Sequence, residues 1–277
     1  MKTLYIIRPI DSRISRWAII LLLVLLPLMI CQAQRKKLNT LELKPQGDVI
    51  LNFIPIVDGK LFFIDSVYIT SGGERIKITN WKFFVSNIAL SSSLGIEEPA
   101  SFENKLPVLL IDYSRVNDSG VHPSIKFNIG DYTDVRFDVG LPRQLNHSDP
   151  TVALPPLDLA QQDMYWEWNS GYIFLLVEGQ LVDAKNERFH FAIGGDNKIM
   201  PFAHGNLFNV SPLVKVEKGR TTQVNFTFDF NKLLKNGDGS NYSLTEEKSR
   251  IVHGGYFADI LSVNAKHAIE FKSVEIK

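Results

Sequence analysis

Short apolar or alternating segments, each closed by turn-forming residues, follow one another from Asp48 to the C-terminus. Such segments between Gly, Pro, Asn and Asp are typical of β-strands. Val224, Phe226 and Phe228 alternate with polar residues, which indicates one half-buried strand late in the chain. The same pattern predicts strands at residues 49–57, 61–70, 76–90, 108–113, 124–129, 135–139, 172–182, 189–193 and 269–276.

Turn signals indicate how the first strands are joined. Asp58-Gly59 separates the first two predicted strands, and Ser71-Gly72-Gly73 separates the second from the third. Glycine after a short polar residue favours the tight turns of β-hairpins. We therefore expect two successive hairpins near the start of the domain.

Helical patterns are rare in this chain. Phe257, Ile260, Leu261 and Asn264 have helical spacing, and Ser243 with the glutamates that follow it could begin a helical turn. Residues 141–164, rich in Pro, Asp and Leu, show no clear period and predict a long loop. The sequence therefore predicts an all-β fold, a two-sheet β-sandwich or barrel-like domain with long loops and little helix.

The N-terminus has the pattern of an export signal. Lys2, Arg8, Arg13 and Arg16 precede residues 18–30, which contain no polar side chain. This apolar run is shorter than the roughly 18 residues that a membrane-spanning helix requires. A basic segment followed by a short apolar segment is typical of a secretory signal peptide.

The end of this signal can be interpreted in two ways. The small side chains of Cys31 and Ala33 suit cleavage after Ala33, whereas a lipoprotein would keep Cys31 as its acylated first residue, a lipid anchor. Either form would be exported to the periplasm, the outer membrane or the cell surface, with no transmembrane anchor in the mature chain. The predicted parts are a signal peptide (1–33), a linker (34–47) and a β domain (48–277).

Composition narrows the classes of function. The chain has 30 basic and 30 acidic residues, and the leader contains four of the basic and one of the acidic, so the mature chain is near −3. This slightly negative charge, and the lack of a stripe of basic residues in the sequence, argue against a surface that binds nucleic acid. Cys31 is the one cysteine of the sequence, so the mature domain has no thiol for a disulfide or an internal thiolate metal site.

Several blocks of the sequence resemble a known family. They are residues 80–90, 110–113, 137–140, 146–150 and 164–179, of which the Trp-x-Trp-x-x-Gly-Tyr segment at 166–172 is the most specific. In this order they are similar to the MbnP-like family of exported proteins. The resemblance implies an all-β, non-enzymatic copper-binding protein. It also implies copper ligation by two histidines and by a tryptophan that a dihaem partner enzyme, of a peroxidase-like type, has oxidised to kynurenine.

The resemblance assigns some of these ligands to residues of this chain. His147 lies in the Asn-His-x-Asp-Pro block, and Trp168, or alternatively Trp166, lies in the Trp-x-Trp block. Ala192 occupies the position where the family usually has its second histidine. His190, His204 and His253 are the alternatives for that ligand, and imidazole suits copper.

Two other readings of the sequence remain open. The aromatic residues around Trp166 could form a metal-free face that binds a carbohydrate or a protein partner. Asp158, Asp163, Glu167 and Glu178 would allow glycoside hydrolysis if two of them lay roughly 5 to 9.5 Å apart. The sequence lacks the Ser-His-Asp, phosphate-loop and His-Glu-x-x-His motifs, so we expect a protein that is not an enzyme.

Overall fold

The computed structural model describes residues 44–102, 106–114, 124–166, 171–184, 187–205 and 213–277. The predicted signal peptide, Cys31, Glu167 and Trp168 lie outside these residues. The chain from Pro45 to Lys277 forms one compact unit. Its first strand begins at Gln46, three residues before the first strand that the sequence pattern predicts.

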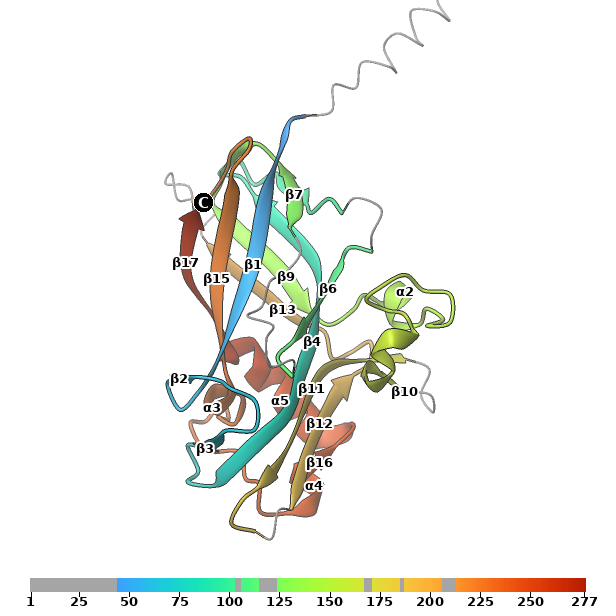
Figure 1. Cartoon of the computed structure of the whole chain (residues 1–277), viewed down its shortest axis with the longest axis vertical. Coiled ribbons are helices and arrows are strands. Elements are labelled where there is room, and N and C mark those ends of the chain that lie inside the picture. Colours follow the sequence, from blue (N-terminus) through green and yellow to red (C-terminus); the bar gives the residue numbers. More distant parts are fainter. Residues whose placement is uncertain (1–43, 103–105, 115–123, 167–170, 185–186, 206–212) are drawn as a thin grey trace, which may run out of the picture. The chain divides into compact units, whose positions relative to one another are not determined.

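In the first sheet, a strand from the start of the domain pairs with a strand from near its C-terminus (Figure 1). Within the described residues its order is β17 (Ile269–Ile276), β15 (Thr221–Asp229), β1 (Gln46–Val57) and β2 (Lys60–Leu61), with β7 (Ile125–Asn128) also paired to β1. Strands β1 and β15 run parallel, in a register that places Phe53 opposite Phe226. Val49, Leu51 and Phe53 of β1 are buried while the residues between them are partly exposed, which confirms the predicted alternation.

The second sheet is larger and carries the candidate site. Its main order is β13 (Met200–Gly205), β9 (Asp134–Val139), β4 (Arg75–Ser91), β11 (Gly171–Leu181), β12 (Arg188–Gly194) and β16 (Ile251–Val252). Strands β3 (Val67–Ile69), β5 (Glu97–Pro99) and β6 (Val108–Asp112) pair with β4, and β10 (Tyr165–Trp166) pairs with β11. A small separate pair consists of β8 (Gly130–Tyr132) and β14 (Val214–Val216).

Aromatic side chains fill the space between the two sheets. The ring of Phe53 in β1 lies 5.4 Å from that of Phe83 in β4 and 5.3 Å from that of Phe137 in β9. Trp81 is fully buried and its ring lies 5.0 Å from that of Phe228 in β15. Edge-to-face contacts at these separations add to the free energy that burial of the rings contributes. The structure thus confirms the predicted two-sheet β fold.

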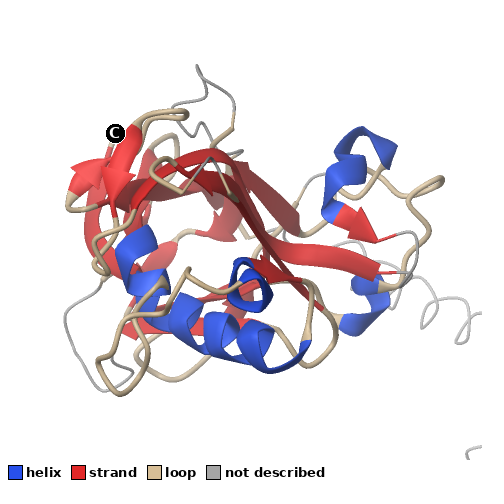
Figure 2. Ribbon diagram, turned by 90° about the horizontal axis from the view of Figure 1, so that it is seen from below, coloured by secondary structure: helices blue, strands red, loops and turns tan. Residues whose placement is uncertain are grey.

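Helices form a small part of the described chain, and Figure 2 shows them beside the strands of the sheets. The longest helix, α5 (Gly255–Ala268), confirms the helical spacing seen in the sequence, and Asn264 Nδ2 donates to the backbone oxygen of Leu233, 3.0 Å away. The short helices are α2 (Arg143–Asn146), α3 (Phe230–Leu233), α4 (Glu247–Arg250) and the 3₁₀ helix η1 (Leu159–Met164). The helical turn expected near Ser243 begins only at Glu247.

The strand predicted over residues 61–70 is wrong in its middle. The structure has β2 and β3 at its two ends, and Asp65 between them has a positive φ of 60°. The hydroxyl of Tyr68 accepts a hydrogen bond from the backbone nitrogen of Phe63, 2.6 Å away. This contact with the backbone replaces the inter-strand bonds that an unbroken strand would make.

His204 lies in a strand that is missing from the strands predicted from the sequence pattern. It belongs to strand β13, opposite Val135 of β9. Phe202 of the same strand stacks on Phe137 at 4.6 Å, and this apolar contact holds β13 against the sheet.

Candidate functional site

The candidate ligand residues fall in three separate places in the described structure. His147 and Trp166 line one cavity, His190 and His253 lie side by side at another point, and His204 lies on β13. Trp168 cannot be placed because it lies outside the described residues. The structure therefore divides the candidate ligands instead of gathering them around one point.

His147 follows the single turn of α2 and is held by Asp196. Its Nε2 atom lies 3.0 Å from Oδ1 and 3.2 Å from Oδ2 of that carboxylate. Arg143 of the same turn brings its Nε atom to 3.6 Å from Asp196 Oδ2. The side chain of His147 is 46% exposed, so this imidazole stays open to solvent while it contacts the carboxylate.

Asn146 connects this histidine to the sheet. It is buried, its Oδ1 atom accepts from the backbone nitrogen of Tyr172 at 2.9 Å, and its Nδ2 atom donates to Asp196 at 2.9 Å. The hydrogen bond from Asn146, followed by that from His147, holds the pKa of Asp196 below its usual value. Asn146 thereby fixes the position of the loop relative to β11.

Trp166 forms one wall of the cavity next to His147. The cavity has a volume of about 270 Å³, and Asp196 and Asn197 also line it. Trp166 is buried and packs so closely over Gly194 that a Cβ atom at that glycine would lie 3.0 Å from the indole. This indole is therefore part of the framework around the cavity, and it is not an exposed aromatic platform.

Ala192, which the sequence resemblance places where the family usually has its second histidine, has no exposed surface. It lies on β12 opposite Leu176, on the same face of the strand as His190 and Gly194. Phe189 and Phe191 project to the other face and are buried in the core. In β12 the phenylalanines therefore point inward, and His190 shares the opposite face with Ala192.

His190 forms a cluster with one carboxylate and one further imidazole. Its Nδ1 atom lies 2.8 Å from Oε1 of Glu178, its partner on β11. The rings of His190 and His253 have their centroids 4.8 Å apart, at an angle of 45°. The parallel pairing of β12 with β16 places His190 opposite Ile251, which carries His253 to this point two residues later.

The protonation states in this cluster follow from its contacts. The hydrogen bond with His190, assisted by one from Asn80 Nδ2 at 2.8 Å, holds the pKa of Glu178 below its ordinary value although burial opposes this. Partial burial, together with the neighbouring His190, lowers the pKa of His253. The cluster therefore combines an ionised carboxylate with a neutral imidazole at neutral pH.

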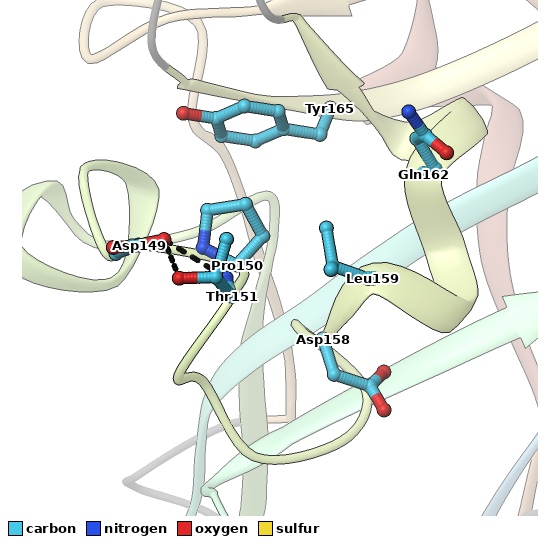
Figure 3. Close-up of a pocket in the computed structure, with 7 residues that line it drawn as sticks. All are labelled: Asp149, Pro150, Thr151, Asp158, Leu159, Gln162 and Tyr165. Carbon is cyan, nitrogen blue, oxygen red and sulfur yellow. Dashed lines mark hydrogen bonds between the residues drawn. The ribbon is translucent and has the colours of Figure 1, made fainter.

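Asp158 and Asp163, the other described carboxylates considered for hydrolysis, have different surroundings. Asp163 accepts from Lys82 Nζ at 2.7 Å, and Asp112 lies 3.5 Å from the same ammonium group. Lys82 thereby fastens η1 to strand β4. Asp158 lines a different cleft, next to Leu159 and Tyr165 (Figure 3).

His204 stacks on Phe271 of β17, with ring centroids 4.1 Å apart. Burial lowers the pKa of His204, although Asp134 acts in the opposite direction. This stacking gives the histidine a packing role between β13 and β17.

The described side chains do not form a complete multidentate metal centre. Among them, no group of three or more His, Cys, Asp or Glu residues could hold a metal ion. His190 and His253 are the candidate ligands that bring two imidazole rings to one place within the described residues.

Comparison with known proteins identifies the family. A model of the MbnP family matches residues 46–253, most of the chain. The chain belongs to the MbnP family. The matched region of this MbnP-family protein contains every candidate ligand described above.

A solved structure of MbnP from Methylosinus trichosporium is similar to this MbnP-family chain, with 17% identity and a TM-score of 0.49. The similarity covers 76% of this chain and 81% of the other. No curated protein matches the chain. Within the residues that the structure describes, no helix has the length and apolar character needed to cross a membrane.

Proposed function

We propose that this MbnP-family chain is an exported, non-catalytic copper-binding protein whose metal is held by His190 and His253. The observation that carries the proposal is the 4.8 Å separation of these two imidazole rings. Imidazole is a common ligand of copper, and the sequence resemblance leads to the same metal. Export follows from the basic and apolar pattern of the first 33 residues.

Glu178 gives His190 the right form to bind a metal. An ionised carboxylate only accepts hydrogen bonds, so the proton of a neutral His190 lies on Nδ1, 2.8 Å from Glu178. The lone pair is then on Nε2. Carboxylates that accept from a ligand histidine in this way orient the ring and raise its basicity.

The second imidazole, His253, favours metal binding because it stays uncharged. Its lowered pKa keeps it neutral at pH values where an ordinary histidine begins to gain a proton. With two protein ligands, the remaining copper positions would be open to water or to a further donor. Such a site would exchange its metal more readily than a closed site with four protein ligands.

A kynurenine formed from Trp166 by a dihaem partner would belong to the other cavity, next to His147, whereas the alternative, Trp168, lies outside the described residues. Among the described residues that line this cavity, His147 carries the one imidazole. Intact mass of protein from the native host tests this modification, since it adds one oxygen atom and removes one carbon atom. An unmodified mass would leave the His190 proposal unchanged.

Copper titration of the purified mature protein tests the site. We expect stoichiometric binding that weakens at least tenfold in His190→Ala and in His253→Ala, and that is retained in His147→Ala and in the control His267→Ala. Loss of binding in His147→Ala alone would place the metal at the Trp166 cavity and refute the His190 site. Absence of binding in the wild type, with all six histidines present, would refute copper binding altogether.

The second candidate function is a metal-free module for a carbohydrate or protein partner. The cavity beside His147 supports it, because amide and carboxylate groups of Asn146, Asp196 and Asn197 line it next to an indole. These groups suit the hydroxyls and the apolar face of a sugar ring. Sugar binding that is lost in His147→Ala, in a protein that does not bind copper, would favour this function.

A further inference from the structure

A second cleft, with no histidine among the residues that line it, opens between the long loop and η1 (Figure 3). It has a volume of about 270 Å³, and Figure 3 shows the ring of Tyr165 lying across it from Pro150 and Leu159. Small-molecule sites usually measure about 300 to 1,000 Å³. The volume of this cleft therefore suits one long side chain better than a whole small-molecule ligand.

Exposed apolar side chains lie in and close to the segments that line this cleft. Leu159, which lines the cleft and begins η1, is 53% exposed. Val152 and Leu154, which follow the lining residue Thr151 in the loop, are 79% and 55% exposed. A single exposed leucine is ordinary, but a group of exposed apolar residues is typical of a binding surface. Tyr165, half-buried, is supported from behind by Tyr172, with ring centroids 5.0 Å apart.

The charge of the cleft is negative. The carboxylate of Asp149 accepts from the hydroxyl of Thr151 at 2.7 Å and from its backbone nitrogen at 2.8 Å, and these bonds lower its pKa. Asp158 also lines the cleft. The ion pairs formed between described residues use other carboxylates, so neither aspartate has a Lys or Arg partner there.

We propose that this cleft docks a protein partner that inserts an arginine side chain between Tyr165 and Leu159. The guanidinium group would lie on the face of the tyrosine ring, and its N–H groups would meet the carboxylates of Asp149 and Asp158. The aliphatic part of the arginine would cover Leu159 and Pro150. Apolar residues beside that arginine would contact Val152 and Leu154, which gives the buried anchor with an apolar surround seen in protein interfaces.

The probe is the peptide acetyl-Leu-Arg-Leu-amide, titrated into the isotope-labelled mature protein and followed by NMR. We expect shift changes confined to residues 149–165, and binding at least fivefold weaker when citrulline, a neutral analogue of similar shape, replaces arginine. The double variant Asp149→Asn/Asp158→Asn and the variant Tyr165→Leu should each weaken binding by a similar factor. Tyr165→Phe should retain it, because the ring face is unchanged.

Controls separate docking from other causes. Asp183→Asn, a change of one exposed carboxylate outside the cleft, should leave the titration unchanged, and thermal unfolding of every variant verifies the fold. Equal binding of the arginine and citrulline peptides would overturn the proposal. So would binding of free arginine amide as tight as that of the peptide, since the cleft would then be a site for small cations.

Discussion

Glu178 and His190 face each other across strands β11 and β12, with the carboxylate oxygen 2.8 Å from the ring nitrogen Nδ1. The carboxylate is a hydrogen-bond partner and leaves the other ring nitrogen for a metal. Because such partners orient ligand histidines, Glu178→Ala should weaken copper binding by about tenfold, within the 10- to 100-fold range usual for these contacts. Isothermal titration at neutral pH measures this change.

The matched control for Glu178 is Asp183→Asn, which alters an exposed carboxylate that pairs with Arg75. Its copper affinity should equal that of the wild type. An unchanged affinity in Glu178→Ala, alongside a loss in His190→Ala, would show that the carboxylate does not orient the ligand.

Ala192→His, which introduces the histidine that the sequence resemblance leads us to expect at this position, should destabilise this protein. Ala192 is fully buried, so an imidazole there would have to displace packed neighbours. Overpacking of this kind costs about 1 to 3 kcal/mol of unfolding free energy. Urea unfolding measures it, with Ala203→His at an exposed position of β13 as the control, for which we expect a change within about 0.5 kcal/mol.

Lys82→Met should lower the free energy of unfolding by about 3 kcal/mol, because it removes the ammonium group that lies 3.5 Å from the buried carboxylate of Asp112. The double variant Lys82→Met/Asp112→Asn also neutralises that carboxylate and should recover at least half of the loss. Urea unfolding of the three variants in a double-mutant cycle gives both values. Additive losses would show that Lys82 acts through Asp163 alone.

Asp48 should contribute stability that depends on pH. The hydrogen bonds from Lys126 Nζ, at 2.7 Å, and from Ser124 lower the pKa of Asp48 from its ordinary value of 3.8. A group with a lowered folded-state pKa stabilises the protein above its unfolded value and loses this effect as pH falls through the folded value. Asp48→Asn should therefore cost about 0.5 to 1 kcal/mol at pH 7, and the difference should shrink as the pH falls below 3.8 and through the lowered folded-state pKa.

Unfolding by urea between pH 2 and 7 measures the dependence on Asp48. Lys126→Met should reduce the same difference, since it removes the main cause of the lowered pKa. A cost for Asp48→Asn that stays constant down to pH 2 would contradict the assignment.

Much of the fold could be predicted from the sequence because its cause is local. The alternation of Val224, Phe226 and Phe228 with polar residues indicates which face of β15 is buried, and this alternation can be seen within one short segment of the sequence. Asp58 and Gly59 have the positive φ angles of a tight hairpin turn, and this preference also depends on the residues themselves. In such segments, one strand or turn can be assigned without knowledge of its partners.

Pairing between distant strands could not be predicted in this way. Strand β16 lies beside β12, which brings His253 to His190, yet no local pattern specifies that neighbour. The contact between His147 and Asp196 could not be predicted for the same reason. The motif around His147 indicated that residue, but apart from the two glycines before it nothing in the local sequence marks Asp196. The two residues meet only in the folded protein.

The parallel contact of β1 with β15 also affects how the chain folds. Asp48 pairs with Thr221, so the first strand has no neighbour on that side until nearly the whole chain has been synthesised. Contacts between such distant residues slow folding, because a long loop must close before they form. Until then Val49, Leu51 and Phe53 remain without the strand that later covers their edge. The newly made chain should therefore stay unfolded for longer than a domain built from local hairpins, and it would depend more on chaperones that bind extended apolar segments.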